Sequence, residues 1–509
     1  MSLQSKNQMD DKQQEQAQQA EYGSSQYVLM QYFEWHLPSD GNHWKRLAED
    51  AQHLSELGVS GVWLPPCAKG TSADDVGYGV YDLYDLGEFD QKNTVRSKYG
   101  TKQELISAID SLHKNGLRVY ADVVLNHKAG ADATEKIRVI EVNPQNREEQ
   151  VGEPFEIEAW TRFDFPGRGD KYSDFKWCWE HFTATDYDAS SERTSIFKIV
   201  GENKDWAAGV DEELGNYDYL MYADVDYHHP LVIEETIKWG RWLIDELKLD
   251  GMRLDAVKHI NEDFAEQFVR AMREHAGSDF YAVGEYWKND TERLTAYLEK
   301  TDHQLALFDV ALHFNFHEAS RAGRDYDLSK IFENTLVQAN PMNVATFVDN
   351  HDSQPGQSLE SWVDDWFKPL AYALILLRQD GYPCLFYGDY YGTDGEHPLP
   401  GKSDLLNPLL EARRNYAYGR QTDYFDHPNV IAWQRWGVSD IEMSGLVAVI
   451  SNGEEGSKEI SYDENWAGLV WRDITGNRQE KITLDEHGRA EFTVNGGSVS
   501  VWIADVATK

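Results

Sequence analysis

The segment KQELISAIDSLHKNGLRVYADVVLNH (102–127) decides the fold. Its first half repeats apolar residues at helical spacing and ends at Gly116, the residue type that commonly closes a helix. Its second half, LRVYADVVL (117–125), is an apolar run of strand length, followed by an Asn-His pair. A helix, a glycine turn and a buried strand with polar residues at its carboxyl end are typical of a parallel α/β fold.

The same unit recurs on both sides of this segment. Apolar runs of strand length occur at 27–33, 59–65, 117–125, 252–257, 281–287, 305–310, 343–350 and 384–389. Helical patterns separate these runs, for example HWKRLAEDAQHLSELG (43–58) with Gly58 at its end. Eight strands that alternate with helices predict an α/β protein built on a (β/α)₈ TIM barrel.

The alternation of strand and helix patterns is interrupted twice, and the interruptions predict the domain boundaries. Too much chain for one helix follows the third strand, and after about residue 420 short alternating stretches with Gly, Asn and Asp turns replace the helices. We expect an inserted small β-rich domain over 128–227 and a C-terminal antiparallel β-sandwich domain over 419–509. The barrel then occupies 25–127 and 228–418, and the polar, Gln-rich residues 1–24 form a disordered tail.

Composition excludes several classes of partner. The formal net charge is −40, from 88 acidic and 48 basic residues, which argues against nucleic acid or an anionic membrane as a partner. No apolar run approaches the length of a membrane span, and the N-terminus lacks the apolar core of a signal peptide. The three cysteines form no CxxC pair, so zinc and thiol-redox sites are not expected. These features favour a cytoplasmic protein, although a secreted mature form stays open.

Carboxylates stand at the ends of three predicted strands: Asp255 in GMRLDAVKH (251–259), Glu285 in VGEYW (283–287) and Asp352 in FVDNHD (347–352). A fourth segment, DVVLNH (122–127), supplies a further Asp and a His. The carboxyl ends of barrel strands are where catalytic residues gather. Because no hydroxyl or thiol nucleophile motif accompanies these acids, they indicate glycosyl chemistry, in which two carboxylates do the covalent and proton-transfer work.

The local settings suggest different roles for the acids. Arg253 lies two residues before Asp255, so we expect the guanidinium to lower the pKa of that carboxyl and to keep it a competent nucleophile. Glu285 follows an apolar strand, and an apolar wall raises a carboxyl pKa, as a general acid requires. A structural ion pair and a solvated strand-end acid are the respective alternatives.

These motifs resemble the four sequence signatures of the α-amylase family, glycoside hydrolase family 13. Further segments, DYLMYADVD (218–226) and VGYGVYDLYDLGEFDQ (76–91), are similar to the liquefying bacterial members, and FKPLAYALILLR (367–378) to the cytoplasmic ones. The resemblance runs from about residue 26 to 505. It implies endo-hydrolysis of internal α-1,4-glucosidic bonds in starch, glycogen and maltodextrins by a retaining double displacement, in a protein that we expect to be a monomer.

The resemblance also assigns residues. It makes Asp255 the nucleophile, Glu285 the general acid/base and Asp352 the transition-state stabiliser. It places nine residues at substrate-side positions, namely Trp35, Tyr78, Asp122, His127, Arg253, Lys258, His259, Trp287 and His351.

The resemblance further implies a calcium site. Its matching ligands are Asn126, Asp218, Asp224 and the backbone carbonyl of His259, and hard oxygen ligands of this kind suit Ca²⁺. The secreted relatives have a second metal cluster with acids where this chain has Thr183 and His228, although Asp205 and Asp226 remain. We therefore expect one calcium ion, with a set of solvated loop acids as the alternative.

Two other functions stay open at this point. A transglycosylase or an exo-type, maltooligosaccharide-forming enzyme would use the same residues, because the chemistry is identical until the acceptor enters. A non-catalytic glucan-binding protein with the same fold is the alternative outside the enzymes, and the presence of all three carboxylates argues against it.

Overall fold

The structure is a computed structural model that describes residues 26–505. The tail expected over 1–24 lies outside the described residues. The described chain divides into two compact units. One contains Gln31–His53 and Gly61–Phe308, and the other contains the residues up to Met30, Leu54–Ser60 and those from Asp309 onward.

Eight strands close a barrel in the order β1-β14-β13-β12-β11-β10-β3-β2. They are β1 (Leu29–Gln31), β2 (Gly61–Leu64), β3 (Arg118–Val123), β10 (Gly251–Leu254), β11 (Tyr281–Gly284), β12 (Ala306–Phe308), β13 (Val344–Phe347) and β14 (Tyr382–Phe386). The pairings of β2 with β3, β3 with β10 and β10 with β11 are parallel. The predicted TIM barrel is thereby confirmed, and each predicted apolar run overlaps one of its strands. Strands β10 and β14 start one and two residues before the runs predicted at 252–257 and 384–389.

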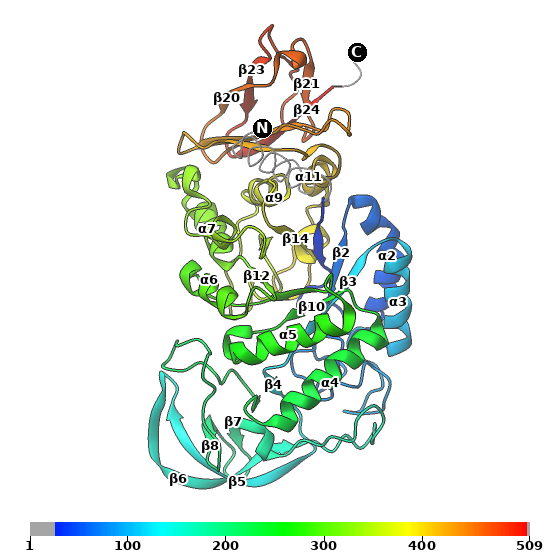
Figure 1. Ribbon diagram of the computed structural model, residues 1–509, viewed down its shortest axis with the longest axis vertical. Coiled ribbons are helices and arrows are strands. Elements are labelled where there is room, and N and C mark those ends of the chain that lie inside the picture. The colour runs from blue at the N-terminus through cyan, green and yellow to red at the C-terminus, as the bar shows by residue number, and fades with distance from the viewer. Residues whose placement is uncertain (1–25, 506–509) are drawn as a thin grey trace, which may run out of the picture. The chain divides into compact units, whose positions relative to one another are not determined.

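Helices lie between these strands and after the last of them. They are α2 (His43–Leu57), α3 (Lys102–Lys114), α4 (Pro230–Leu247), α5 (Glu262–Ala276), α6 (Thr291–Lys300), α7 (Val310–Ala322), α8 (Leu336–Ala339), α9 (Lys368–Leu376), α10 (Tyr387–Tyr390) and α11 (Ser403–Tyr416). Helix α3 starts with a capping box between Thr101 and Glu104, and Gly116 follows it at φ +77°. Helices α4 and α5 lie side by side (Figure 1).

Between β3 and α4 the chain forms a sheet in the order β4-β9-β7-β8-β5-β6, and its pairings are antiparallel. The strands are β4 (His127–Lys128), β5 (Ala133–Asn143), β6 (Asn146–Arg162), β7 (Phe182–Asp188), β8 (Arg193–Ile199) and β9 (Ala223–Val225). Strands β5 and β6 form the long curved hairpin in Figure 1. Phe163, Phe182 and Phe197 lie in the apolar core of this inserted segment.

The C-terminal part is antiparallel, as the sequence predicts. One sheet has the order β17-β18-β19-β24-β21-β22, and β20 pairs with β23. The strands are β17 (Gln421–Tyr424), β18 (Val430–Arg435), β19 (Leu446–Ser451), β20 (Gly456–Ser461), β21 (Val470–Asp473), β22 (Ile482–Thr483), β23 (Arg489–Val494) and β24 (Ser498–Ala504). Their core contains Trp471, Phe492 and Trp502. Within residues 26–505, no helix combines the length and the apolar character needed to cross a bilayer.

Candidate active site

Arg253 is the centre of the predicted site. It is completely buried on β10, one residue before that strand ends. Its Nη1 lies 2.9 Å from Asp122 Oδ1 and 2.6 Å from Asp255 Oδ1, and its Nη2 lies 3.3 Å from Glu285 Oε2. One buried guanidinium therefore contacts three carboxylates at the carboxyl ends of β3, β10 and β11.

The strand register explains why these groups meet. Arg253 pairs with Asp122 of β3 on one side and with Val283 of β11 on the other. Asp255 lies just past β10, and its amide donates to the Val123 carbonyl (3.0 Å), so it continues the line of the strand. The spacing argument for Arg253 and Asp255 thus gave the correct contact, although Asp255 itself is outside the strand.

Glu285 is held from two directions. Its Oε2 accepts a hydrogen bond from the Ala256 amide (2.9 Å) in addition to the Arg253 contact. Ala256 adopts a left-handed conformation (φ +49°), which a residue with a side chain rarely takes and which turns the chain directly after Asp255. Burial raises the pKa of Glu285 to about 7, although Arg253 opposes the shift. The predicted direction of this shift is confirmed.

Aromatic residues surround Asp122. Its Oδ2 accepts hydrogen bonds from the Tyr78 hydroxyl (2.9 Å) and from the Trp63 indole N–H (3.1 Å). The Trp63 ring also lies under the Arg253 guanidinium, whose central carbon is 5.1 Å from the ring centroid. Tyr78 stacks on Trp35 with ring centroids 6.0 Å apart and an interplanar angle of 3°. Tyr78, Trp35 and Asp122 therefore lie together.

Sequence reasoning missed Trp63. One feature of the sequence indicated its role: Trp63 lies on the second predicted strand. A side chain on that strand that faces the barrel interior lies close to β3. His127 was predicted and is buried, with its Nε2–H donating to the Tyr78 carbonyl (2.8 Å). Burial lowers the pKa of His127, which favours the neutral ring.

Lys258, His259 and Trp287 form a second group. Lys258 Nζ lies 3.2 Å from the Trp287 carbonyl and 4.7 Å from the centroid of the Tyr217 ring. His259 Nδ1 donates to the Tyr217 carbonyl (2.6 Å). Tyr217, in the inserted segment, was not predicted, and it links these residues to the loop before β9.

Asp352 and His351 belong to the other compact unit. They follow β13, and His351 Nε2 lies 3.3 Å from Asp352 Oδ2. The Asp352 amide donates to Asn350 Oδ1 (2.9 Å), so the backbone of this loop is fixed by a neighbouring side chain.

The predicted calcium ligands comprise two buried carboxylates and an amide. Asn126 Nδ2 lies 3.4 Å from Asp224 Oδ1, and Thr183 donates its hydroxyl to Asp224 Oδ2. Burial raises the pKa of Asp218 to about 7 and that of Asp224 well above its usual value, and the charge of Asp218 adds to the shift at Asp224. Two buried carboxylates that repel each other, with an amide beside them, fit a hard cation. Among residues 26–505, no group of three or more His, Cys, Asp or Glu side chains is arranged to bind a metal.

Lysines pair with Asp205 and Asp226, the two acids that the resemblance to the secreted relatives places at a second metal cluster. Lys204 Nζ lies 2.5 Å from Asp226 Oδ2, and His228 Nδ1 lies 3.3 Å from Asp226 Oδ1. Asp205 pairs with Lys198. These acids already have cationic partners from the chain.

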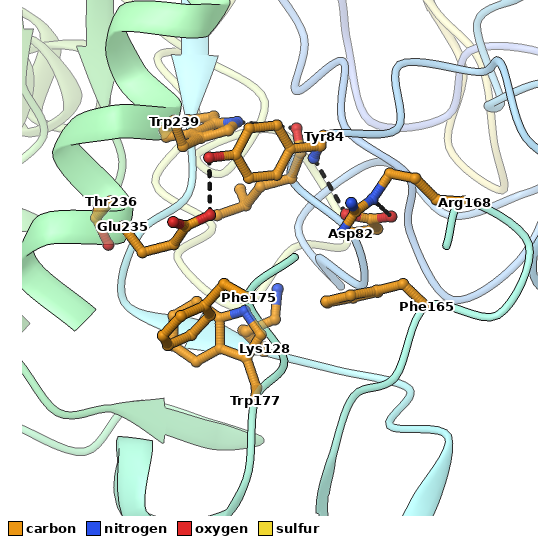
Figure 2. A pocket seen from close by; sticks show the side chains of 11 residues that line it. Asp82, Tyr84, Lys128, Phe165, Arg168, Phe175, Trp177, Glu235, Thr236 and Trp239 are labelled. Carbon is orange, nitrogen blue, oxygen red and sulfur yellow. Dashed lines mark hydrogen bonds and ion pairs between the residues drawn. The ribbon is translucent and has the colours of Figure 1, made fainter. Parts of the chain in front are cut away.

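None of the predicted catalytic residues lines a small cavity of about 10 Å³ that Figure 2 shows. Asp82, Arg168, Glu235 and Trp177 are among its lining residues. Lys128, directly after His127, points its amine into it. In the described chain, this buried amine has no hydrogen-bond partner, and the Trp177 ring centroid lies 5.1 Å away.

Comparison with known proteins gives a consistent result. Residues 27–434 match the family described as alpha amylase, catalytic domain, and residues 446–503 match alpha-amylase C-terminal. The chain is 54% identical to an alpha-amylase of Bacillus licheniformis over 478 residues, covering 94% of this chain and 93% of the relative. It is 52% identical to a glucan 1,4-alpha-maltohexaosidase of Bacillus sp. (strain 707), covering 95% and 94%. It is 46% identical to a cytoplasmic alpha-amylase of Escherichia coli (strain K12), covering 94% and 99%.

Proposed function

Because the chain belongs to the α-amylase family and is an α-amylase that hydrolyses internal α-1,4-glucosidic bonds, we propose that Asp255, Glu285 and Asp352 carry out this reaction. The single observation that supports this best is the contact of buried Arg253 with Asp122, Asp255 and Glu285. It places an ion-paired carboxylate beside one whose pKa lies near neutrality. Retaining glycosidases need this pair of a nucleophile and a proton donor.

In the first step, an Asp255 oxygen attacks the anomeric carbon as the bond to the glycosidic oxygen breaks. Glu285 gives its proton to the departing oxygen, so the leaving chain departs as an alcohol. Arg253 Nη1 lies 2.6 Å from Asp255 Oδ1 and so holds the attacking carboxylate by an ion pair. A covalent glucosyl ester on Asp255 results.

In the second step, Glu285, now ionised, takes a proton from water, which attacks the same carbon and releases Asp255. Two inversions retain the anomeric configuration. Asp352, His351 and His127 act on the sugar hydroxyls and the developing positive charge. Tyr78 and Trp35 form the aromatic platform beneath the reactive sugar, and Lys258, His259 and Trp287 contact the neighbouring sugars.

Anomer-resolved proton NMR of fresh maltoheptaose digests tests the assignment, with Glu285→Gln as the comparison. We expect prompt α-anomer products that vanish in the variant. Prompt β-anomers would overturn the double displacement. A Glu285→Gln variant that keeps its activity would remove Glu285 from the acid/base role.

One relative favours a particular product pattern. A maltohexaose-forming glucanase shares 52% identity with this chain over nearly its whole length. A maltohexaose-forming activity is therefore a second candidate within the same chemistry. The early products from amylose distinguish endo-hydrolysis from a maltohexaose-forming activity. A broad range of product lengths indicates endo-hydrolysis, and a predominance of maltohexaose indicates the maltohexaose-forming activity.

We further propose that one calcium ion binds at Asn126, Asp218, Asp224 and the His259 carbonyl. The raised pKa values of both carboxylates support a cation that neutralises them. The ion would supply structural cohesion between the inserted sheet and the loop after β10. The Lys204 and Lys198 ion pairs support a single ion, because those ammonium groups already neutralise the acids of the second cluster.

The substrate is an α-glucan. We propose that the protein acts in the cytoplasm on glycogen or imported maltodextrin, a location supported by the resemblance to the cytoplasmic relative. Fractionation of the native host tests this, and recovery mainly from the medium without lysis would contradict it.

A further inference from the structure

A buried polar cluster holds the loop that carries His351 and Asp352. Its first member, Asp349, follows β13 and is 1% exposed. Asp349 Oδ1 accepts the Ser353 hydroxyl (2.7 Å), and Oδ2 accepts the Val363 amide (3.1 Å). The same Oδ2 is paired with Lys368. Asp349 therefore uses both carboxylate oxygens within the protein interior.

Ser353 and Asn350 continue this network to the Asp352 backbone. Ser353 Oγ accepts the Asn350 amide (3.0 Å). Asn350 Oδ1 in turn accepts the amides of Asp352 and Ser353, both at 2.9 Å. An unbroken series of hydrogen bonds thus connects the Asp349 carboxylate with the main chain of Asp352.

Lys368 anchors the far end of the network. It is the first residue of α9, and its side chain is fully buried over the Trp362 ring. Its Nζ lies 2.6 Å from Asp389 Oδ1, and the Tyr372 hydroxyl donates to Asp389 Oδ2 (2.7 Å). Two buried carboxylates therefore share one ammonium group. Burial raises the pKa of Asp349 to about 7, although Lys368 opposes the shift.

A buried ion cluster is a costly way to fill this space. The free energy needed to remove such charges from water offsets much of their electrostatic attraction. Proteins in which apolar residues replace a buried ion pair are often as stable. Hydrogen bonds, unlike apolar contacts, are directional, and here they end on the amides of one loop. Their geometry therefore specifies the conformation of that loop rather than only its stability.

We infer that Asp349, Ser353 and Lys368 are positioning residues that hold the loop after β13 so that the Asp352 carboxylate is presented in one orientation. This inference rests on the proposed role of Asp352 in catalysis. None of the three touches substrate in this scheme. They act through the Asp352 main chain.

Ser353→Ala tests the inference, because it breaks the network at one hydroxyl and leaves the charged cluster intact. The matched control is Ser320→Ala on α7. Ser320 is also buried, donates its hydroxyl to the His317 carbonyl (2.7 Å) and accepts the Asp364 amide (3.1 Å). Both changes delete one donated and one accepted hydrogen bond, but only the first lies in the network.

On maltoheptaose we expect Ser353→Ala to lower kcat by roughly 10- to 100-fold with KM within about twofold, since a small misplacement of a reacting group has this effect. Ser320→Ala should leave kcat within about twofold at a similar melting temperature. Ser353→Thr, which keeps the hydroxyl, should recover most of the lost kcat. A folded Ser353→Ala with normal kcat, or equal losses in both Ser→Ala variants, would overturn the inference.

Asp352→Asn, assayed in parallel, separates this inference from the proposed function. An inactive Asp352→Asn beside a fully active Ser353→Ala refutes the positioning network alone. An active Asp352→Asn refutes the role of Asp352, and the inference falls with it. An inactive Asp352→Asn with a slowed Ser353→Ala supports both.

Discussion

Arg253 Nη2 lies 3.3 Å from Glu285 Oε2, and yet the pKa of Glu285 is raised to about 7. Arg253 divides its charge among three carboxylates, and burial of Glu285 outweighs its share. The same guanidinium thus forms an ion pair with Asp255 and leaves Glu285 able to hold a proton near neutral pH. Two carboxylates at one cation can therefore take opposite roles.

The pH profile of the enzyme follows from Glu285. The proton donor must be protonated in the free enzyme, so kcat/KM should fall above about pH 7, by about tenfold for each further pH unit. Initial rates on maltoheptaose at concentrations far below KM, measured from pH 5 to 9, check this. A flat alkaline limb up to pH 9 would show that another group donates the proton.

Folding stability should also depend on the same carboxyl, because its pKa is higher in the folded protein than its ordinary value. Its ordinary pKa is 4.5 and its pKa in the folded protein is about 7, so between these values the folded state holds a proton that the unfolded state has lost. The stability that Glu285 contributes is therefore complete below pH 4.5 and decreases as the pH rises to 7.

Glu285→Gln removes this dependence. Relative to the parent, the variant should gain roughly 3 kcal/mol in its free energy of unfolding between pH 5 and pH 8, because each pH unit between the two pKa values corresponds to about 1.4 kcal/mol. Urea unfolding of both proteins at both pH values measures the difference. An unchanged difference between the two proteins would mean that the carboxyl titrates alike in the folded and unfolded states.

Chelation should weaken the fold if calcium binds as proposed. Free calcium at about 100 times its Kd stabilises a protein by about 3 kcal/mol, and EDTA should remove this gain. Asp224→Asn should abolish the difference between calcium and EDTA in thermal unfolding. Asp188→Asn is the control, because Asp188 is also buried in the same sheet but accepts hydrogen bonds from Ser190, Ser191 and the Glu158 amide. Equal EDTA sensitivity in both variants would contradict the ligand set.

Lys128 offers a test of the cavity in Figure 2. Its amine is buried among the rings of Phe163, Phe165 and Trp177. An apolar side chain of similar length should suit this setting better, so Lys128→Met should stabilise the fold by about 1–3 kcal/mol in urea unfolding. Lys136→Met, at an exposed position, should be neutral. A destabilised Lys128→Met would contradict this expectation and show that the contacts of the amine with these rings outweigh its burial.

The acids at the strand ends could be predicted from the sequence because the carboxyl ends of all strands in a parallel barrel lie at one face. Local spacing also predicted the contact of Arg253 with Asp255. It could not predict the contact of Arg253 with Glu285, or that of Trp63 with Asp122, because both depend on the register between neighbouring strands. That register is set by packing between distant segments and leaves no local pattern.

The buried polar cluster around Asp349 and Lys368 could not be predicted from the sequence for a related reason. Asp349, Lys368 and Asp389 lie in three separate segments. Asp349 belongs to the FVDNHD motif, but no local pattern connects it with Lys368 or Asp389. Only their common burial shows that they act together. The apolar run 370–377 predicts a buried helix, but the lysine that precedes it carries no signal of its own.

The pairing of β4 with β9 has a further consequence. His127 on the substrate side and Asp224 on the proposed calcium side are direct partners in that register. A displacement of the His127 main chain is transmitted to Asp224 through this pairing. We therefore expect bound sugar and bound calcium to change each other's affinity. By thermodynamic reciprocity, the factor by which calcium tightens sugar binding must equal the factor by which bound sugar tightens calcium. A bound glucan chain would then raise the affinity of the protein for the ion by that same factor.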